Sequence, residues 1–374
     1  SRKPETERPA AGYPVRQKAP ALLFPESIRM PRISRLTFFI PVFAFAVAFA
    51  CGTPIFAEEA VLSGTALGEL DGTPPEPPAG FATKELAMAG ILTGKVKIID
   101  KDPAVPEDVE IIADVQYGTG GGTPLALDLY RPKNLSQPVP ALVFIHGGAW
   151  SKGKRTDYRL YGIDFAKRGY VVASVSYRLT NVAPFPAAVQ DVKCAVRFLR
   201  ANAAKYGIDP DKIAAAGGSA GGHLALMVGY SSGVPELEGD GGNAGVSSRV
   251  QAVVDLYGPV DLTTEFAQAA SPVKRFMANK TYKEAREMYE QASPIVHVSA
   301  DDPPTLILHG TIDEVVPIVQ SDMLAEKLKE TGVPYIYDRL PGWTHAMDVS
   351  QSVNERCQWL MERFFARYVP LPQK

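Results

Sequence analysis

The chain has 374 residues, of which 46% are hydrophobic, and its formal net charge of −2 is close to neutral. This size and composition suffice for one large hydrophobic core, alone or with a small cap. No basic run interleaved with aromatic residues occurs, which argues against nucleic-acid binding. The three cysteines, Cys51, Cys194 and Cys357, lack the paired spacing of a zinc site, so we expect neither a metal nor a cofactor.

The first recognisable feature along the chain is a predicted secretory signal peptide at residues 30–57. Met30 is followed by two arginines and then by an apolar run at residues 36–51. A basic start before a short apolar segment is typical of such peptides, and the run is shorter than a membrane span of about 20 residues. We therefore expect a secreted or periplasmic protein, and we interpret residues 1–29 as an upstream segment without periodic structure.

The fate of this segment has two alternatives. Cleavage after Ala50 fits the small-residue rule better than cleavage after Ala57, and it would expose Cys51 as in a lipoprotein. An uncleaved segment would instead anchor the chain. Contact with a membrane is accordingly expected only if the segment is retained or Cys51 is lipidated.

Residues 58–106 mix glycine, proline and acidic residues, which is typical of a linker or loose extension. Strand and helix patterns then alternate over residues 107–370, which predicts an α/β domain with a mostly parallel, eight-stranded sheet and helices on both faces. Residues 263–298 break the alternation and are expected to form a small helical cap. The expected strands are 109–115, 125–130, 141–145, 171–175, 213–216, 250–256, 304–309 and 335–339. The expected helices are 161–168, 186–206, 223–229, 321–331 and 353–368.

A candidate nucleophile lies where an expected strand runs directly into an expected helix. The sequence there is Gly217-Gly218-Ser219-Ala220-Gly221-Gly222, which contains the pattern Gly-x-Ser-x-Gly. A nucleophilic serine stands on a tight turn, and glycines two residues to either side let strand and helix approach without a Cβ clash. A glycine-rich loop that merely contains serine is the alternative. The strand before and the helix after favour Ser219 as a nucleophile.

A second glycine-rich segment, His146-Gly147-Gly148-Ala149-Trp150, follows the expected strand 141–145. Such a strand end leaves backbone N–H groups unpaired, as an oxyanion hole requires. A simple turn is the alternative, and the serine motif downstream argues against it. Trp150 here, and Trp343 beside a later loop, are candidates to line a substrate pocket or else to fill the core.

The acid and base of a catalytic triad are expected after the serine in chain order. His309-Gly310-Thr311-Ile312-Asp313 ends one expected strand, and His345 follows the next. Both loops would lie at the same edge of the sheet as Ser219. We predict that His345 is the general base and that Asp313 fixes its tautomer. Of the competing acids, Glu314 would point elsewhere and Asp261 would tie down its own loop.

These motifs resemble those of the α/β-hydrolase superfamily, specifically its hormone-sensitive-lipase-like and bacterial feruloyl-esterase-like carboxylesterases. The resemblance covers roughly residues 109–368 and includes Tyr177-Arg178-Leu179 and Phe185-Pro186-Ala187-Ala188 beside the motifs above. It implies the α/β-hydrolase fold, ester hydrolysis through an acyl-enzyme, and backbone oxyanion donors at Gly148, Ala149 and Ala220. Many relatives carry a third glycine at the position of Ala149, so its Cβ is expected to trim the acyl pocket.

The resemblance implies a reaction class and leaves the substrate open. Similar proteins hydrolyse short-acyl or aryl esters, including acetyl and feruloyl esters of plant polysaccharides, so the expected partner is a small-molecule or polysaccharide-linked ester. An amide-cleaving arylformamidase or peptidase is one alternative, and a non-enzymatic binding protein on the same fold is another. The oligomeric state stays open. The family's fold also implies that Cys194 and Cys357 lie on helices covering opposite faces of the sheet, too far apart for a disulfide.

Overall fold

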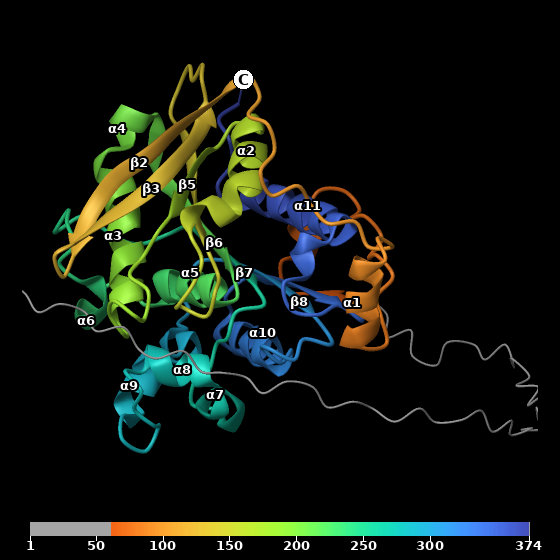
Figure 1. Ribbon diagram of the computed structural model, residues 1–374. Helices are drawn as coiled ribbons and strands as arrows, with labels where there is room; N and C mark the ends of the chain where they lie inside the picture. Colours follow the sequence, from red (N-terminus) through yellow and green to blue (C-terminus); the bar gives the residue numbers. More distant parts are fainter. Residues whose placement is uncertain (1–60, 374) are drawn as a thin grey trace, which may run out of the picture. The chain divides into compact units, whose positions relative to one another are not determined.

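The computed structural model describes residues 61–373, which fold around a nine-stranded sheet (Figure 1). The strand order is β1-β9-β8-β7-β6-β4-β5-β3-β2. Neighbours from β9 through β5 are parallel, whereas β1, β3 and β2 pair in antiparallel fashion. The expected mostly parallel α/β sheet is confirmed. The strands are β1 Val61–Ser63, β2 Val109–Gly120, β3 Thr123–Pro132, β4 Val139–Ile145, β5 Val171–Val175, β6 Ile208–Gly218, β7 Ala252–Leu256, β8 Thr305–Gly310 and β9 Tyr335–Leu340.

The ninth strand comes from the segment that we expected to be a linker. β1 pairs with β9, and helix α1 (Lys84–Leu92) follows, its first turn capped by the Thr83 hydroxyl. In contrast to the expectation, residues 61–106 belong to the folded domain. A three-residue strand is too short to show a periodic pattern in the sequence. It forms only by pairing with β9, which lies far away in the chain. The upstream segment 1–29, the predicted signal peptide and Cys51 lie outside the described residues.

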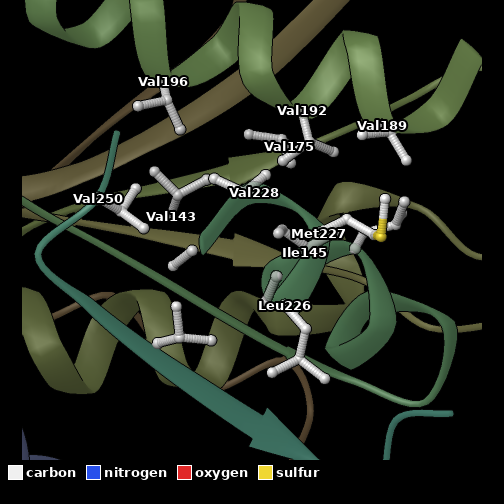
Figure 2. Close-up of a cluster of buried hydrophobic side chains, with 14 of the residues drawn as sticks. Val143, Ile145, Val175, Val189, Val192, Val196, Leu226, Met227, Val228 and Val250 are labelled. Carbon is white, nitrogen blue, oxygen red and sulfur yellow. The ribbon is translucent and has the colours of Figure 1, made fainter. Parts of the chain in front are cut away.

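Helices cover both faces of the sheet, as expected. One face carries α3 (Ala187–Ala201), α5 (Ala220–Tyr230) and α10 (Val319–Thr331). The other face carries α2 (Arg159–Lys167) and α11 (Gln351–Tyr368). Figure 2 shows part of the first core, in which side chains of β4, β5, α3 and α5, together with Val250 just before β7, pack together: Val143, Ile145, Val175, Val189, Val192, Val196, Leu226, Met227, Val228 and Val250.

The short elements complete the described chain. Four of them form the stretch that breaks the alternation, namely α7 Glu265–Ala269, α8 Ser271–Phe276, α9 Arg286–Gln291 and the 3-10 helix η3 Pro294–His297. In Figure 1, α7, α8 and α9 lie together beyond α5 and α10, at one end of the domain. The others are η1 Leu67–Glu69, η2 Arg155–Tyr158, α4 Ala203–Tyr206, α6 Pro235–Glu238 and η4 Met347–Val349. The cap is therefore small and helical.

The two cysteines of the domain lie on opposite faces. Cys194 on α3 belongs to the first core and Cys357 on α11 to the second, and both are buried free thiols. Burial raises the pKa of both thiols, which keeps them protonated and unreactive. Within residues 61–373, no three His, Cys, Asp or Glu side chains are grouped to hold a metal ion. No helix in that range is both long and apolar enough to span a bilayer.

Candidate active site

The turn between β6 and α5 places Ser219 in a strained backbone conformation. Its φ is 57° and its ψ is −123°, a region that non-glycine residues rarely occupy. A Cβ on Gly221 would lie 2.0 Å from the carbonyl oxygen of Ile145, and one on Gly217 would lie 2.4 Å from that of Gly221. Only glycine fits at both positions. The backbone contacts thus give the physical reason for the glycine spacing seen in the sequence.

The three predicted triad residues meet at the carboxyl edge of the sheet. His345 Nε2 is 2.9 Å from Ser219 Oγ, and His345 Nδ1 is 2.6 Å from Asp313 Oδ2. A carboxylate only accepts hydrogen bonds, so Nδ1 carries the imidazole proton and Nε2 is free to accept the proton of the serine hydroxyl. The residues follow β6, β8 and β9, which explains how positions far apart in sequence come together.

The surroundings of Asp313 keep its carboxylate ionised. Oδ1 accepts the backbone N–H groups of Val315 and Val316 at 2.8 and 2.9 Å, and Oδ2 lies 3.2 Å from His309 Nε2. Burial alone raises the pKa of Asp313, but the hydrogen bonds from His309 and His345 outweigh it and hold that pKa well below its usual range. The carboxylate therefore orients His345 and stabilises the imidazolium that forms during catalysis.

The two competing acids occupy the places expected from the sequence. Asp261 Oδ1 accepts hydrogen bonds from the backbone and the hydroxyl of Thr263, at 2.8 and 2.6 Å, and so fixes its own loop. Glu314 is exposed and pairs with Lys84 of α1. Neither carboxylate contacts His345 among the described hydrogen bonds, so Asp313 is the acid of this site.

Backbone donors for an oxyanion lie beside the serine. Gly148, Ala149 and Trp150 all have positive φ, between 54° and 105°, which turns the loop after β4 away from strand geometry. The N–H groups of Gly148 and Ala149 form no hydrogen bond with any residue in the described range. The N–H of Ala220 belongs to the first turn of α5, where a helix leaves its donors unpaired and adds a partial positive charge. Ala149, Ser219 and Ala220 line one cavity, as an oxyanion hole requires.

Two cavities open on Ser219. The smaller offers about 60 Å³ to the centres of water-sized spheres, and its lining is mainly apolar. The lining consists of Ala149 and Trp150 from the loop after β4 (the oxyanion loop, residues 146–154), Ser219 and Ala220 at the start of α5, Pro259 after β7, Phe266, Ala267, Ala270, Pro272 and Val273 of the cap, Val315 and Val316 after β8, and Gln320 of α10. The larger offers about 590 Å³ and is more polar. Ser219, Ala149 and Val315 line both cavities, whereas His345 lines only the larger.

The two candidate pocket tryptophans differ in position. Trp150 lines the smaller cavity, stacks on Phe276 with a centroid separation of 4.5 Å, and donates its Nε1–H to His223 Nδ1 at 3.2 Å. Trp343 lines neither of the two cavities at Ser219. The pocket role considered for Trp343 is therefore not supported. Its side chain instead contacts Phe81 and Pro78, and no sequence motif indicates this contact.

Residues 61–106, which we call the extension, hold the loop that carries His345. Phe81 N donates to the carbonyl of Gly342 at 2.8 Å, and the Phe81 ring packs edge-on against Trp343 at 5.6 Å between centroids. Trp343 Nε1 donates to the carbonyl of Pro78 at 3.0 Å. These contacts fix the residues immediately before the catalytic histidine.

A second set of contacts fixes the other end of the same loop. Ile99 N donates to the carbonyl of Val349 at 3.0 Å, and Gln351 N donates to the carbonyl of Lys97 at 2.8 Å. The histidine loop is thus bonded to the extension on both sides of His345. Sequence reasoning missed this role, because no motif marks it.

We expect Phe81→Ala to lower kcat by about tenfold to a hundredfold with a smaller change in KM, because small displacements of a catalytic group carry penalties of this size. Steady-state kinetics on 4-nitrophenyl acetate, with thermal melting to verify folding, provide the measurement. Leu92→Ala is the matched control, since Leu92 lies on α1 of the same extension and is 80% exposed. An unchanged kcat in folded Phe81→Ala protein would show that the extension does not position His345.

Three known proteins to which the chain is similar in sequence or structure are named esterases. Esterase LipQ of Mycobacterium tuberculosis (strain ATCC 25618 / H37Rv) is 34% identical over 251 residues, which cover 65% of this chain and 59% of LipQ. The chain thus spans about three fifths of the length of that relative. A truncated carbohydrate esterase from gut microbiota superposes with a TM-score of 0.61 at 30% identity, over 70% of this chain and 99% of the other.

A second solved structure is the thermophilic esterase Est2 of the Planctomycetes species Thermogutta terrifontis with butyrate bound. It superposes with a TM-score of 0.61 at 28% identity, over 72% of this chain and 97% of the other. The BD-FAE family model matches residues 127–328, more than half of the chain, and this range includes Ser219 and Asp313 but ends before His345. The resemblance stated from the sequence is confirmed, and the chain belongs to the BD-FAE family of α/β-hydrolases.

Proposed function

We propose that the protein is a serine esterase that hydrolyses carboxylic esters of short acyl groups through an acyl-enzyme. The observation that carries this proposal is the hydrogen-bonded chain from Ser219 through His345 to Asp313, beside unpaired backbone donors. The names of the relatives support it, since LipQ, the gut carbohydrate esterase and Est2 are all called esterases.

The geometry assigns each residue a step. Ser219 Oγ attacks the ester carbonyl carbon while His345 Nε2 takes the hydroxyl proton, and the oxyanion is held by the backbone N–H groups of Ala149 and Ala220, with that of Gly148 beside them. Collapse of the intermediate breaks the bond to the alcohol oxygen, which receives the proton from His345. A water molecule, deprotonated by His345, then attacks the acyl-enzyme and releases the carboxylic acid and free Ser219.

The position of His345 distinguishes the two cavities. The leaving alcohol must lie within reach of His345 Nε2, because that atom protonates it. His345 lines the larger cavity and not the smaller one, so the alcohol occupies the larger cavity. The acyl group then occupies the smaller, mainly apolar cavity between Trp150 and the cap.

The size of the smaller cavity limits the acyl group. The smaller cavity offers about 60 Å³ to the centres of water-sized spheres, against about 590 Å³ in the larger cavity, so the acyl side is the tighter of the two. This tighter space supports a preference for short acyl groups such as acetyl, propionyl and butyryl over a bulky feruloyl group. Among the proposed substrates, the cavity therefore favours acetyl esters. The Est2 structure with bound butyrate supports the same acyl range.

Among 4-nitrophenyl esters, we expect kcat/KM to be highest between acetate and butyrate and to fall on the order of tenfold or more by octanoate, because an overfilled apolar cavity must distort. Val273→Ala, which removes two methyl groups from the cavity wall, should raise the rate on hexanoate relative to acetate. Val319→Ala is the control, since Val319 is 51% exposed and lies outside this lining. Equal rates on octanoate and acetate would contradict the acyl assignment.

The amide-cleaving alternative is tested with the same protein. An esterase hydrolyses 4-nitrophenyl acetate much faster than N-formylkynurenine, whereas an arylformamidase shows the reverse order.

The basic and apolar segment at residues 30–57 supports a secreted or periplasmic location as part of the proposal. An extracytoplasmic esterase would meet esters of polysaccharides or small molecules outside the cell, which is consistent with an open alcohol cavity.

A further inference from the structure

The larger cavity carries three positive side chains from three separate segments of the chain. Lys101 belongs to the extension, Lys152 to the oxyanion loop and Arg275 to cap helix α8, and all three line the space that also contains Ser219 and His345. All three side chains are exposed. None of the three forms a side-chain hydrogen bond or an ion pair with any residue between 61 and 373.

The two carboxylates of the same lining are already engaged. Asp157 Oδ2 accepts the backbone N–H of Lys154 at 3.0 Å at the start of η2. Asp348 accepts the hydroxyl groups of Tyr161, at 2.9 Å, and of Tyr257, and it is buried. The positive charges therefore remain available to a ligand, whereas the negative charges are held by protein donors.

Arginines elsewhere in the domain show a different arrangement. The guanidinium of Arg178 pairs with Asp191 at 2.7 Å, and that of Arg356 pairs with Asp338 at 2.8 Å. Arg275 has no such partner within the described range, although it lines the same cavity as the nucleophile. The lining thus carries three unpaired cations against two engaged carboxylates. This excess of positive charge makes the electrostatic potential of the cavity favourable for an anion, because a concave surface focuses the field of the charges that line it.

We propose that the larger cavity binds a leaving alcohol that bears a negative charge, such as a carboxylate-substituted sugar or phenol, through Lys101, Lys152 and Arg275. This inference rests on the proposed esterase function. The volume of about 590 Å³ is within the usual range for a small-molecule site and accommodates a ring system. The preferred substrate is then a short-acyl ester, above all an acetyl ester, of an anionic alcohol.

The test compares two substrates of the same shape and different charge. 4-Acetoxybenzoate is an anion at neutral pH, and 4-acetoxybenzamide is its neutral isostere with the same acetyl group. We expect kcat/KM, normalised to the hydroxide-catalysed rate of each ester, to favour the anion on the order of tenfold at low ionic strength, since one exposed ion pair contributes about 1.5- to 5-fold. The preference should lie in KM and should shrink at 0.5 M salt, where charges are screened over about 4 Å.

Variants attribute the preference to the three cations. In the triple variant Lys101→Gln, Lys152→Gln, Arg275→Gln, the ratio of the two rates should fall to about one. The charge-conserving variant Lys101→Arg, Lys152→Arg, Arg275→Lys should retain a preference for the anion, which separates charge from shape. The control is Lys133→Gln, because Lys133 is an exposed lysine far from the site. It directly follows β3, whose end lies beside the start of β5, and this edge of the sheet is opposite the edge that carries Ser219.

Equal normalised rates of the wild-type enzyme on the two esters would overturn this inference and leave the proposed esterase function intact. A triple variant that keeps the preference would overturn it in the same way. Failure of the wild-type enzyme to hydrolyse both esters and 4-nitrophenyl acetate would contradict the proposed function itself.

Discussion

Replacement of Ser219 by alanine is expected to lower kcat for 4-nitrophenyl acetate by about 10⁴- to 10⁶-fold, because the nucleophile of an acyl-enzyme mechanism has no substitute. The protein should stay folded, since the hydroxyl's described hydrogen bond is with His345 and no core contact depends on it. Kinetics with highly purified protein and a thermal melt on the same sample measure both parts.

Ser247→Ala is the matched control, because Ser247 is exposed on the loop before β7. Its activity should equal that of the wild type. Retention of more than about a hundredth of the wild-type kcat by Ser219→Ala would mean that another group attacks the substrate.

The second large effect is expected for Asp313→Asn, at about 10⁴-fold in kcat. The backbone N–H groups of Val315 and Val316 require an acceptor at the Oδ1 position, so the amide oxygen of asparagine must face them. The amide NH₂ then faces His345 Nδ1, which has to become an acceptor, and the imidazole proton moves to Nε2. In that tautomer His345 cannot take the proton of Ser219.

The two competing carboxylates, Asp261 and Glu314, provide the controls for Asp313→Asn. Asp261→Asn changes a loop contact with Thr263, and Glu314→Gln removes an exposed pairing with Lys84. Both should retain kcat within a few-fold of the wild type. A loss in Asp261→Asn comparable with that expected for Asp313→Asn would reassign the acid to the loop after β7.

The sequence was informative where local motifs carry chemistry. The serine turn could be predicted from the sequence because it requires two glycines. A Cβ at Gly217 or Gly221 would lie within 3 Å of backbone atoms. Asp313 and His345 could be predicted because each follows a strand, and parallel strands have their carboxyl ends at the same edge of the sheet. The resemblance to a known fold placed Cys194 and Cys357 on opposite faces, where the structure has them.

Features that depend on packing between distant segments could not be predicted. Phe81 and Trp343 are separated by more than 250 positions, and nothing in either local sequence marks their contact. The strand β1 has three residues, too few for a pattern to emerge above chance. Cavity volumes likewise arise from how the cap and the loops meet. Neither the size of the smaller cavity nor the shared position of Lys101, Lys152 and Arg275 on the larger one could therefore be predicted.

The central claim is that Ser219 forms a covalent acyl-enzyme, and covalent labelling tests it most directly. The folded protein is treated with a fluorophosphonate probe, digested, and mapped by mass spectrometry. We predict one modified peptide with the probe on Ser219, its formation slowed by orders of magnitude in His345→Ala and abolished by prior heat denaturation. A folded wild-type protein that remains unlabelled, or that carries the probe on another residue, would contradict the account.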